Sequence, residues 1–345
     1  MGRKASHHER FTTRLNETRK HGEIDSTPFH TKAIRLKGIV LAGGSGTRLF
    51  PMTQVISKQL LPVYDKPMIY YPLSLLLLAK IREILIITNA SEQGLFRALL
   101  GSGEQWGVKF TYEVQASPGG LAQAYLIARD FLAGEASCLV LGDNILYGHG
   151  LTEELQAGAS LRKGARIFAY RVPDPQRYGV VEFSDDVRVL SLEEKPQQPK
   201  SNFAIPGVYF HDGRAPDFAA KLKPSPRGEL EITDLNRIYF DAGELSVGVL
   251  GRGIAWFDTG TPSSLLQSAN FVETIFERQG FKIACLEEIA YTTGLIDQES
   301  ALAQADQYGK TEYGAYIREV VTSRDKALLE KIRPTNSPDS SRPIV

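Results

Sequence analysis

Short apolar runs alternate with segments of helical periodicity between residues 37 and 141. The runs are apolar, β-branched or strictly alternating, as expected of strands. The predicted strands are Lys37–Ala42, Glu83–Thr88, Val108–Val114 and Cys138–Leu141, and the predicted helices between them are Pro72–Ala79, Ser91–Leu100 and Gly120–Leu132. Strands separated by helices of this length indicate a parallel sheet wrapped by helices. Because such crossovers are right-handed, we expect the active crevice at the carboxyl ends of the strands.

The pattern changes from Ala165 onward, where shorter strands are separated by turns. The strands predicted there are Ile167–Val172, Gly179–Phe183, Val187–Leu192 and Ile205–Phe210, and helical periodicity returns at Glu231–Phe240 and Pro262–Arg278. The predicted fold class is therefore α/β. We expect a Rossmann-like mixed, mainly parallel sheet flanked by helices, followed by a smaller, partly antiparallel part and a C-terminal helical region.

The two ends of the chain differ from the rest. Residues 1–36 are polar and show no sustained periodicity, and the last residues are rich in Pro and Ser. We predict a disordered extension over 1–36, a folded domain over 37–320 and a loose tail over 321–345.

Charge and composition exclude several classes of function. Lys plus Arg and Asp plus Glu both number 40, so net charge offers no basis for binding nucleic acid or a membrane surface. No apolar run is long enough to span a bilayer, and the first residues lack the apolar core of a secretory signal. We therefore expect a cytoplasmic protein. Cys138 and Cys285 lie in apolar surroundings and are predicted to be buried, reduced thiols.

A glycine-rich loop, Leu41–Leu49 (LAGGSGTRL), directly follows the first predicted strand. Glycines allow a sharp turn and let backbone N–H groups approach phosphate oxygens, while Arg48 supplies a fixed positive charge. The loop lacks the Lys-Ser/Thr of a Walker A motif, and Leu49 stands where a dinucleotide fingerprint needs glycine. Asp65 follows the loop at about the sequence spacing of the acid that binds the ribose in dinucleotide-binding proteins. However, it lies in a turn-like stretch rather than at the end of a strand. Taken alone, the loop could also be a tight turn.

Four further residues have the chemistry of a phosphate-transfer site. Lys58 is a second cation near the loop, although an isolated lysine is usually a solvated charge. Gln115 has an amide that can read a pyrimidine edge, or can cap a loop. Asp143 follows a strand and is a metal-ligand candidate as well as a turn former, with Asp258 as its plausible partner.

Several separated motifs together resemble those of the sugar-phosphate nucleotidyltransferases. They are LAGGSGTRLFPMT, Ser57–Pro62 (SKQLLP) and Lys66–Pro72 (KPMIYYP). Within that family the chain is most similar to the glucose-1-phosphate thymidylyltransferases, over roughly residues 37 to 318. The resemblance implies Mg²⁺-dependent transfer of a thymidylyl group from dTTP to glucose 1-phosphate. The products would be dTDP-glucose and pyrophosphate, in the first step of dTDP-rhamnose and deoxysugar biosynthesis.

The resemblance also implies a role for individual residues. Nucleotide binding is assigned to Leu41, Gly43, Gly44, Ser45, Gly46, Thr47, Arg48, Lys58, Gln59, Gln115 and Gly120. Sugar-phosphate binding is assigned to Asn144, Tyr178, Gly179, Glu194, Lys195, Ile205 and Arg227. The implied Mg²⁺ ligands are Asp143 and Asp258, and the implied catalytic cations are Arg48, Lys58 and Lys195.

The family also implies an internal division and an assembly. The nucleotide-binding part is expected at about 37–160, the sugar-binding part at about 161–260 and the helical region at about 261–320. A homotetramer with a dTDP-sugar as allosteric ligand is expected.

Three positions depart from the family pattern, and two alternative functions are also compatible with the sequence. The family commonly has Asp at Gly119, Thr at Pro206 and an aromatic residue at Ile254. Pro206 removes a hydroxyl and a backbone donor near the sugar pocket. One alternative is the same chemistry with UTP or another sugar 1-phosphate, since thymine and uracil differ by one methyl group. The other is a non-catalytic regulatory subunit that binds a sugar nucleotide.

Overall fold

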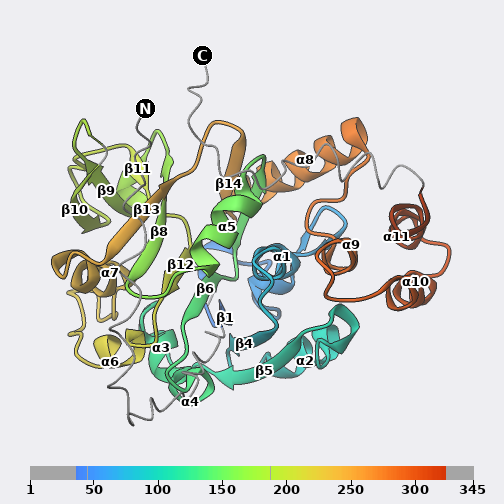
Figure 1. The fold of residues 1–345 in the computed structure, drawn as a ribbon, viewed down its shortest axis with the longest axis horizontal. Helices are drawn as coiled ribbons and strands as arrows, with labels where there is room; N and C mark the ends of the chain where they lie inside the picture. Colours follow the sequence, from blue (N-terminus) through green and yellow to red (C-terminus); the bar gives the residue numbers. More distant parts are fainter. Residues whose placement is uncertain (1–35, 45, 187, 324–345) are drawn as a thin grey trace, which may run out of the picture. The chain divides into compact units, whose positions relative to one another are not determined.

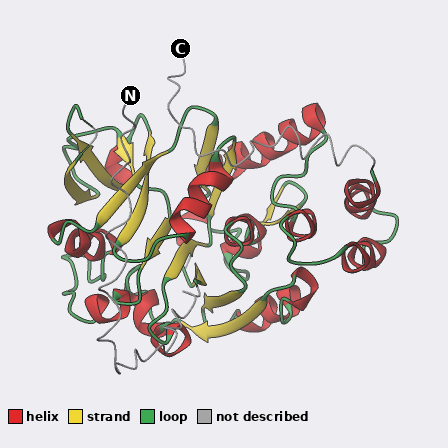
Figure 2. Cartoon of the chain, in the orientation of Figure 1, coloured by secondary structure: helices red, strands yellow, loops and turns green. Residues whose placement is uncertain are grey.

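A computed structural model describes residues 36–323 except Ser45 and Val187 (Figures 1 and 2). The predicted extension, apart from residue 36, lies outside the described residues, and so does the tail from residue 324. Helix α11 (Glu312–Thr322) runs into the first residues of the predicted tail. The internal boundaries near 160 and 260 stay predictions.

One half of the main sheet is parallel. Its strands, in spatial order, are β6 (Ser137–Leu141), β1 (Lys37–Ala42), β4 (Glu83–Thr88) and β5 (Lys109–Val114). All four were predicted within two residues of these bounds. Side chains alternate along each strand, so Ile39 packs on one face of the sheet and Val40 on the other.

The other half is mixed. It continues beyond β6 through β12 (Val208–His211), β8 (Ala165–Arg171), β11 (Phe203–Ala204), β9 (Gly179–Phe183) and β10 (Val189–Glu194), with β13 (Leu245–Val249) parallel to β8. The predicted mixed sheet is confirmed, with the parallel pairs concentrated in the first half. The prediction of one strand over Ile205–Phe210 was wrong, since residues 205–207 separate β11 from β12. Pro206 cannot donate to a ladder, which explains the break.

Helices cover both faces of the sheet (Figure 2). One face is covered by α1 (Tyr70–Leu78), α2 (Gln93–Leu100), α5 (Leu151–Ala159) and α9 (Leu286–Thr292). The other is covered by α3 (Gln123–Ile127), α4 (Arg129–Leu132), α6 (Ala215–Ala219) and α7 (Ile232–Asp241). The predicted helix Gly120–Leu132 is thus two short helices, and it begins three residues later. The predicted helix Pro72–Ala79 begins earlier, at Tyr70, and nearly all of α1 is buried.

Helices α8 (Pro262–Gln279), α10 (Gln298–Gln307) and α11 complete the C-terminal region, and α10 and α11 lie at the right of Figure 1. Thr261 caps α8 by accepting a hydrogen bond from the Ser264 amide. The carboxylate of Glu287, on α9, is completely buried. It accepts hydrogen bonds from Trp106 at 3.1 Å, Tyr308 at 2.9 Å and Tyr313 at 2.8 Å, which tie the last helices to the parallel half.

Two small sheets complete the described structure. The strands β7 (Asn144–Gly148) and β14 (Ile254–Asp258) form an antiparallel pair, and so do β2 (Pro62–Val63) and β3 (Lys66–Pro67). Short 3₁₀ turns lie at Thr47–Leu49 (η1), Lys58–Leu60 (η2), Glu104–Trp106 (η3) and Pro175–Arg177 (η4). In the part of the chain that the structure describes, no helix combines the length and apolarity needed to cross a membrane.

Candidate active site

A cleft of about 310 Å³ opens beside the carboxyl ends of β1 and β6. Its walls come from both halves of the sheet, as the crossover argument predicts. The residues with a predicted role that line it are Leu41, Gly44, Arg48, Lys58, Gln59, Gln115, Gly120, Asp143, Asn144, Tyr178, Gly179, Glu194, Lys195, Ile205, Arg227 and Asp258. Gly43, Gly46 and Thr47 lie in the loop beside the cleft without lining its wall, and Ser45 is not among the described residues.

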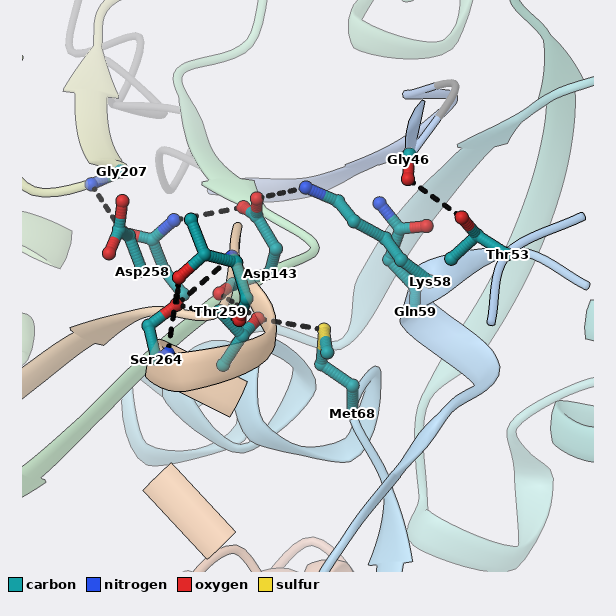
Figure 3. A network of polar contacts seen from close by, with 12 residues as sticks. Gly46, Thr53, Lys58, Gln59, Met68, Asp143, Gly207, Asp258, Thr259 and Ser264 are labelled. Atoms are coloured by element: carbon teal, nitrogen blue, oxygen red, sulfur yellow. Dashed lines mark hydrogen bonds and ion pairs between the residues drawn. The ribbon is translucent and has the colours of Figure 1, made fainter. Parts of the chain in front are cut away.

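The glycine loop leaves β1 at Ala42 and turns into η1 at Thr47. Gly46 has a positive φ of 60°, and its carbonyl accepts a hydrogen bond of 2.7 Å from the Thr53 hydroxyl (Figure 3). Arg48 is exposed and makes no hydrogen bond or ion pair with the described residues. Its guanidinium is therefore available to an anion in the cleft.

Lys58 and Asp143 form an ion pair across the cleft (Figure 3). The other carboxylate oxygen of Asp143 accepts a hydrogen bond of 3.0 Å from the side-chain amide of Asn144. Burial raises the pKa of the Asp143 carboxyl, but the Lys58 ammonium and the hydrogen bonds outweigh it, so the pKa lies below its ordinary value of 3.8. The Thr259 hydroxyl and amide donate to the Asp143 carbonyl at 2.8 and 3.1 Å, which fixes the backbone there.

Asp258 reaches the same place through strand pairing. In the β7–β14 ladder it stands opposite Asn144, the residue after Asp143. Its carboxylate lies 3.0 Å from the Arg177 guanidinium. Burial, with a further contribution from Asp143, raises the pKa of the Asp258 carboxyl despite the nearby Arg177 and Tyr178.

Asp143 and Asp258 both line the cleft, and carboxylates are ligands that suit Mg²⁺. Magnesium is commonly held by one or two carboxylates, with water and phosphate oxygens completing its shell. Among residues 36–323, apart from the two undescribed positions, no group of three or more His, Cys, Asp or Glu is arranged to hold a metal. Water, or the oxygens of a phosphate substrate, would complete the shell of an ion held by these carboxylates.

Two buried side-chain amides line the cleft where the sequence predicts nucleotide binding. Gln59 is 2% exposed and accepts a hydrogen bond of 2.5 Å from the Ser57 hydroxyl. Gln115 is 6% exposed, and its Nε2 donates to Gln123 at 2.7 Å. Gly120 has a φ of 97° and passes so close to Leu230 that a side chain at position 120 would clash with its backbone.

Elsewhere in the cleft, acidic and basic side chains form a network of hydrogen bonds and ion pairs. Glu194 accepts a hydrogen bond of 2.5 Å from Thr233, and burial raises the pKa of its carboxyl. Arg227 makes two bonds of 2.8 Å to Glu231 and lies 3.3 Å from Glu194. Lys195 is 3.8 Å from Glu194. This arrangement offers hydrogen-bond acceptors for hydroxyls beside cations for a phosphate.

The backbone beside this network is tightly constrained. The Gly179 carbonyl accepts a hydrogen bond of 2.8 Å from the Ile205 amide. A methyl group at position 179 would lie 2.9 Å from the Thr233 hydroxyl. Gly179 therefore lets Thr233 reach Glu194.

Among the residues that were not predicted are four that contact predicted side chains of the cleft. Arg177 pairs with Asp258, and Trp256 donates a hydrogen bond of 2.7 Å to Asn144 and packs on Tyr178 at 4.9 Å between ring centroids. Thr233 and Gln123 hold Glu194 and Gln115. The signal for Trp256 was available, because it lies two residues before Asp258 on the same face of a strand. Arg177, Thr233 and Gln123 gave no such signal, because their partners lie far along the chain or at no regular helix or strand spacing from them.

Comparison with known proteins places the chain among nucleotidyl transferases. The family model described as "Nucleotidyl transferase" matches residues 37–275. The chain is 61% identical to a glucose-1-phosphate thymidylyltransferase of Xanthomonas campestris pv. campestris, over 81% of this chain and 95% of that protein. It is 55% identical to the protein of the same name from Neisseria gonorrhoeae, over 83% and 99% of the two chains. The predicted resemblance is confirmed.

Solved structures agree with the sequence relatives. A crystal structure described as a glucose-1-phosphate thymidylyltransferase from Bacillus anthracis in complex with sucrose is 39% identical, with a TM-score of 0.64. The alignment covers 68% of this chain and 94% of that one. A UDP-glucose pyrophosphorylase complexed with UDP-glucose is 22% identical, with a TM-score of 0.60 over 70% of this chain and 99% of that one, and supports the α/β fold alone.

Proposed function

The chain belongs to the nucleotidyl transferase family, and from that premise we propose that it transfers a thymidylyl group from dTTP to glucose 1-phosphate. Nucleotidyl transfer to a sugar 1-phosphate is the chemistry that its relatives' names share. The observation that carries the proposal is the meeting of Asp143, Asp258 and Lys58 in the middle of one cleft. The buried amides of Gln59 and Gln115 line the same cleft, and so do the charged side chains of Glu194, Lys195 and Arg227.

The reaction needs no protein nucleophile. A phosphate oxygen of glucose 1-phosphate is already an anion and can attack the α-phosphorus of dTTP directly, in line with the departing pyrophosphate. The protein's task is to align the two substrates and to neutralise negative charge. Mg²⁺, held by Asp143 and Asp258, would supply positive charge to the phosphates at the point of transfer.

Four cationic side chains would neutralise the negative charge of the phosphates that remains. Arg48 makes no hydrogen bond or ion pair with the described residues and would bind the triphosphate where pyrophosphate leaves. Lys58, which pairs with Asp143, would lie beside the same phosphates. Lys195 would meet the sugar phosphate, with Arg227 as a second clamp and Glu194 accepting hydrogen bonds from sugar hydroxyls.

The nucleotide could also be UTP, since the single methyl group of thymine changes binding by only about 1–3 kcal/mol in a pocket. Another hexose 1-phosphate is the corresponding alternative on the sugar side, where Pro206 departs from the family pattern. A non-catalytic role is disfavoured, because Arg48, Lys58 and both aspartates are present and face one cleft.

The test is release of pyrophosphate by purified protein with Mg²⁺, glucose 1-phosphate and a panel of nucleoside triphosphates. We expect turnover with dTTP and loss of activity when the metal is chelated. Absence of pyrophosphate with every triphosphate would refute the proposed function. Faster turnover with UTP, or with another sugar 1-phosphate, would move the protein to a neighbouring activity of the same family.

The proposed setting follows the family resemblance. The product dTDP-glucose would enter dTDP-rhamnose and deoxysugar synthesis in the cytoplasm. The protein would act as a homotetramer, with a dTDP-sugar as feedback ligand. Sedimentation with and without dTDP-rhamnose tests the assembly, and inhibition kinetics test the feedback.

A further inference from the structure

The side-chain amide of Gln115 is held in one orientation. Its Nε2 donates a hydrogen bond of 2.7 Å to the Gln123 Oε1 atom. Its own Oε1 receives no hydrogen bond from any described residue, although Gln115 is only 6% exposed. Gln115 lines the cleft, so this oxygen, which has no partner among the described residues, is an acceptor at the place where a base would bind.

The backbone N–H of Gly119 determines the orientation of the side-chain amides of Gln123 and Gln115. The Gly119 N–H donates a bifurcated hydrogen bond, to the Gln123 Oε1 atom at 3.0 Å and to the Ser117 carbonyl at 2.8 Å. A backbone N–H can only donate, so Gln123 must present its oxygen to it. That oxygen then requires the NH₂ group of Gln115. Reversing the Gln115 amide would place two acceptors in contact and leave both buried and unpaired.

The Gly119 backbone is itself fixed. Its carbonyl accepts a hydrogen bond of 2.8 Å from the Leu230 backbone amide, and the Ala122 backbone amide, three residues later, donates to the Leu230 carbonyl at 3.0 Å. The donor that orients Gln123 therefore belongs to a loop tied at both ends to another segment.

Gly43 makes room for the unpaired oxygen. An ideal Cβ at position 43 would lie 2.4 Å from the Gln115 Oε1 atom, well inside contact distance. The absence of a side chain there lets the oxygen lie against the glycine loop.

We propose that Gln123 is a positioning residue for base selection. By holding Gln115 with its oxygen free, it makes the site require a hydrogen-bond donor on the base. Thymine and uracil carry N3–H and satisfy this requirement. Cytosine has an unprotonated N3 that would face the oxygen, acceptor against acceptor. The inference rests on the proposed function and adds to it rejection of cytosine nucleotides, without separating dTTP from UTP.

Two substitutions separate orientation from packing. Gln123→Leu keeps the approximate volume but removes the acceptor Oε1, so the Gln115 amide can turn. Gln123→Glu keeps oxygens that accept from Gln115 and from Gly119. The experiment measures kcat/KM for dTTP and for dCTP, and the calorimetric Kd of each nucleotide, in the wild type and both variants. Circular dichroism checks that the variants fold.

We expect Gln123→Leu to lower the dTTP/dCTP preference by about tenfold or more, because one oriented hydrogen bond is lost. Gln123→Glu should retain the wild-type preference, and KM for glucose 1-phosphate should stay unchanged in both variants. An unaltered preference in a folded Gln123→Leu protein overturns the inference and leaves the proposed function standing. An equal loss of preference in both variants also overturns it. A wild type that binds and turns over no triphosphate refutes the proposed function instead.

Discussion

Asp258 stands opposite Asn144, the residue after Asp143, in the ladder between β14 and β7, and the side chains of both aspartates line one cleft. Two acidic groups from distant parts of the chain thereby share one cleft. Their pKa values are shifted in opposite directions, down for Asp143 beside Lys58 and up for Asp258, where burial dominates. These two carboxylates are the ligands proposed above for Mg²⁺.

Replacing Asp143 tests the proposed metal ligand. We expect Asp143→Ala to lower kcat by at least about 100-fold, because charge stabilisation at the reacting phosphate is lost. The protein should remain folded, since the backbone there is held by the Thr259 hydrogen bonds to the Asp143 carbonyl. Pyrophosphate release measures activity, and circular dichroism monitors the fold. Wild-type turnover in the folded variant would remove the metal assignment.

Arg177 neutralises Asp258 at 3.0 Å and should compete with a divalent cation for that carboxylate. We expect Arg177→Ala to tighten Mn²⁺ binding to the free protein by roughly twofold to tenfold, the range for a partly exposed ion pair. Isothermal titration without substrates measures the affinity. Arg177→Lys keeps the charge and should change the affinity less. Unchanged or weaker binding in Arg177→Ala would contradict the competition.

His211 should make stability depend on pH. It is completely buried between Tyr125, at 2.6 Å, and Asn236, at 2.9 Å, and burial lowers the pKa of its imidazole from 6.5 to about 4. The unfolded chain therefore binds more protons between these values. The contribution of His211 is fully present above pH 6.5 and is lost as the pH falls toward 4.

Urea unfolding of the wild type and of His211→Gln at several pH values measures this effect. The free energy of unfolding of the wild type should fall relative to the variant by up to about 3 kcal/mol between pH 6.5 and 4. Parallel curves for the two proteins would show that His211 does not titrate in this way.

Glu287 should hold the C-terminal helices in place. Its carboxylate satisfies the Trp106 indole and the hydroxyls of Tyr308 and Tyr313. Glu287→Leu leaves three donors without an acceptor, so we expect a loss of about 3 kcal/mol or more in the free energy of unfolding. Glu287→Gln keeps one oxygen and should lose clearly less. Thermal unfolding measures both, and equal melting temperatures for the two variants would argue against this role of the carboxylate.

Local sequence was sufficient for much of this protein. The strands Lys37–Ala42, Glu83–Thr88 and Gly179–Phe183 were predicted with the bounds that the structure has, because apolar and β-branched runs specify buried strands locally. The glycine loop and the residue types of the site were also recognisable, because a phosphate-transfer site needs particular side chains in particular motifs.

Tertiary structure decided how those residues meet. Nothing local predicts that β7 pairs with β14, since a ladder between distant strands is selected by packing of the whole domain. The same holds for the Arg177–Asp258 ion pair and for the orientation of the Gln115 amide, which depends on the folded position of Gly119. Side-chain identity set which chemistry was available, and only long-range packing set the distances and directions on which that chemistry depends.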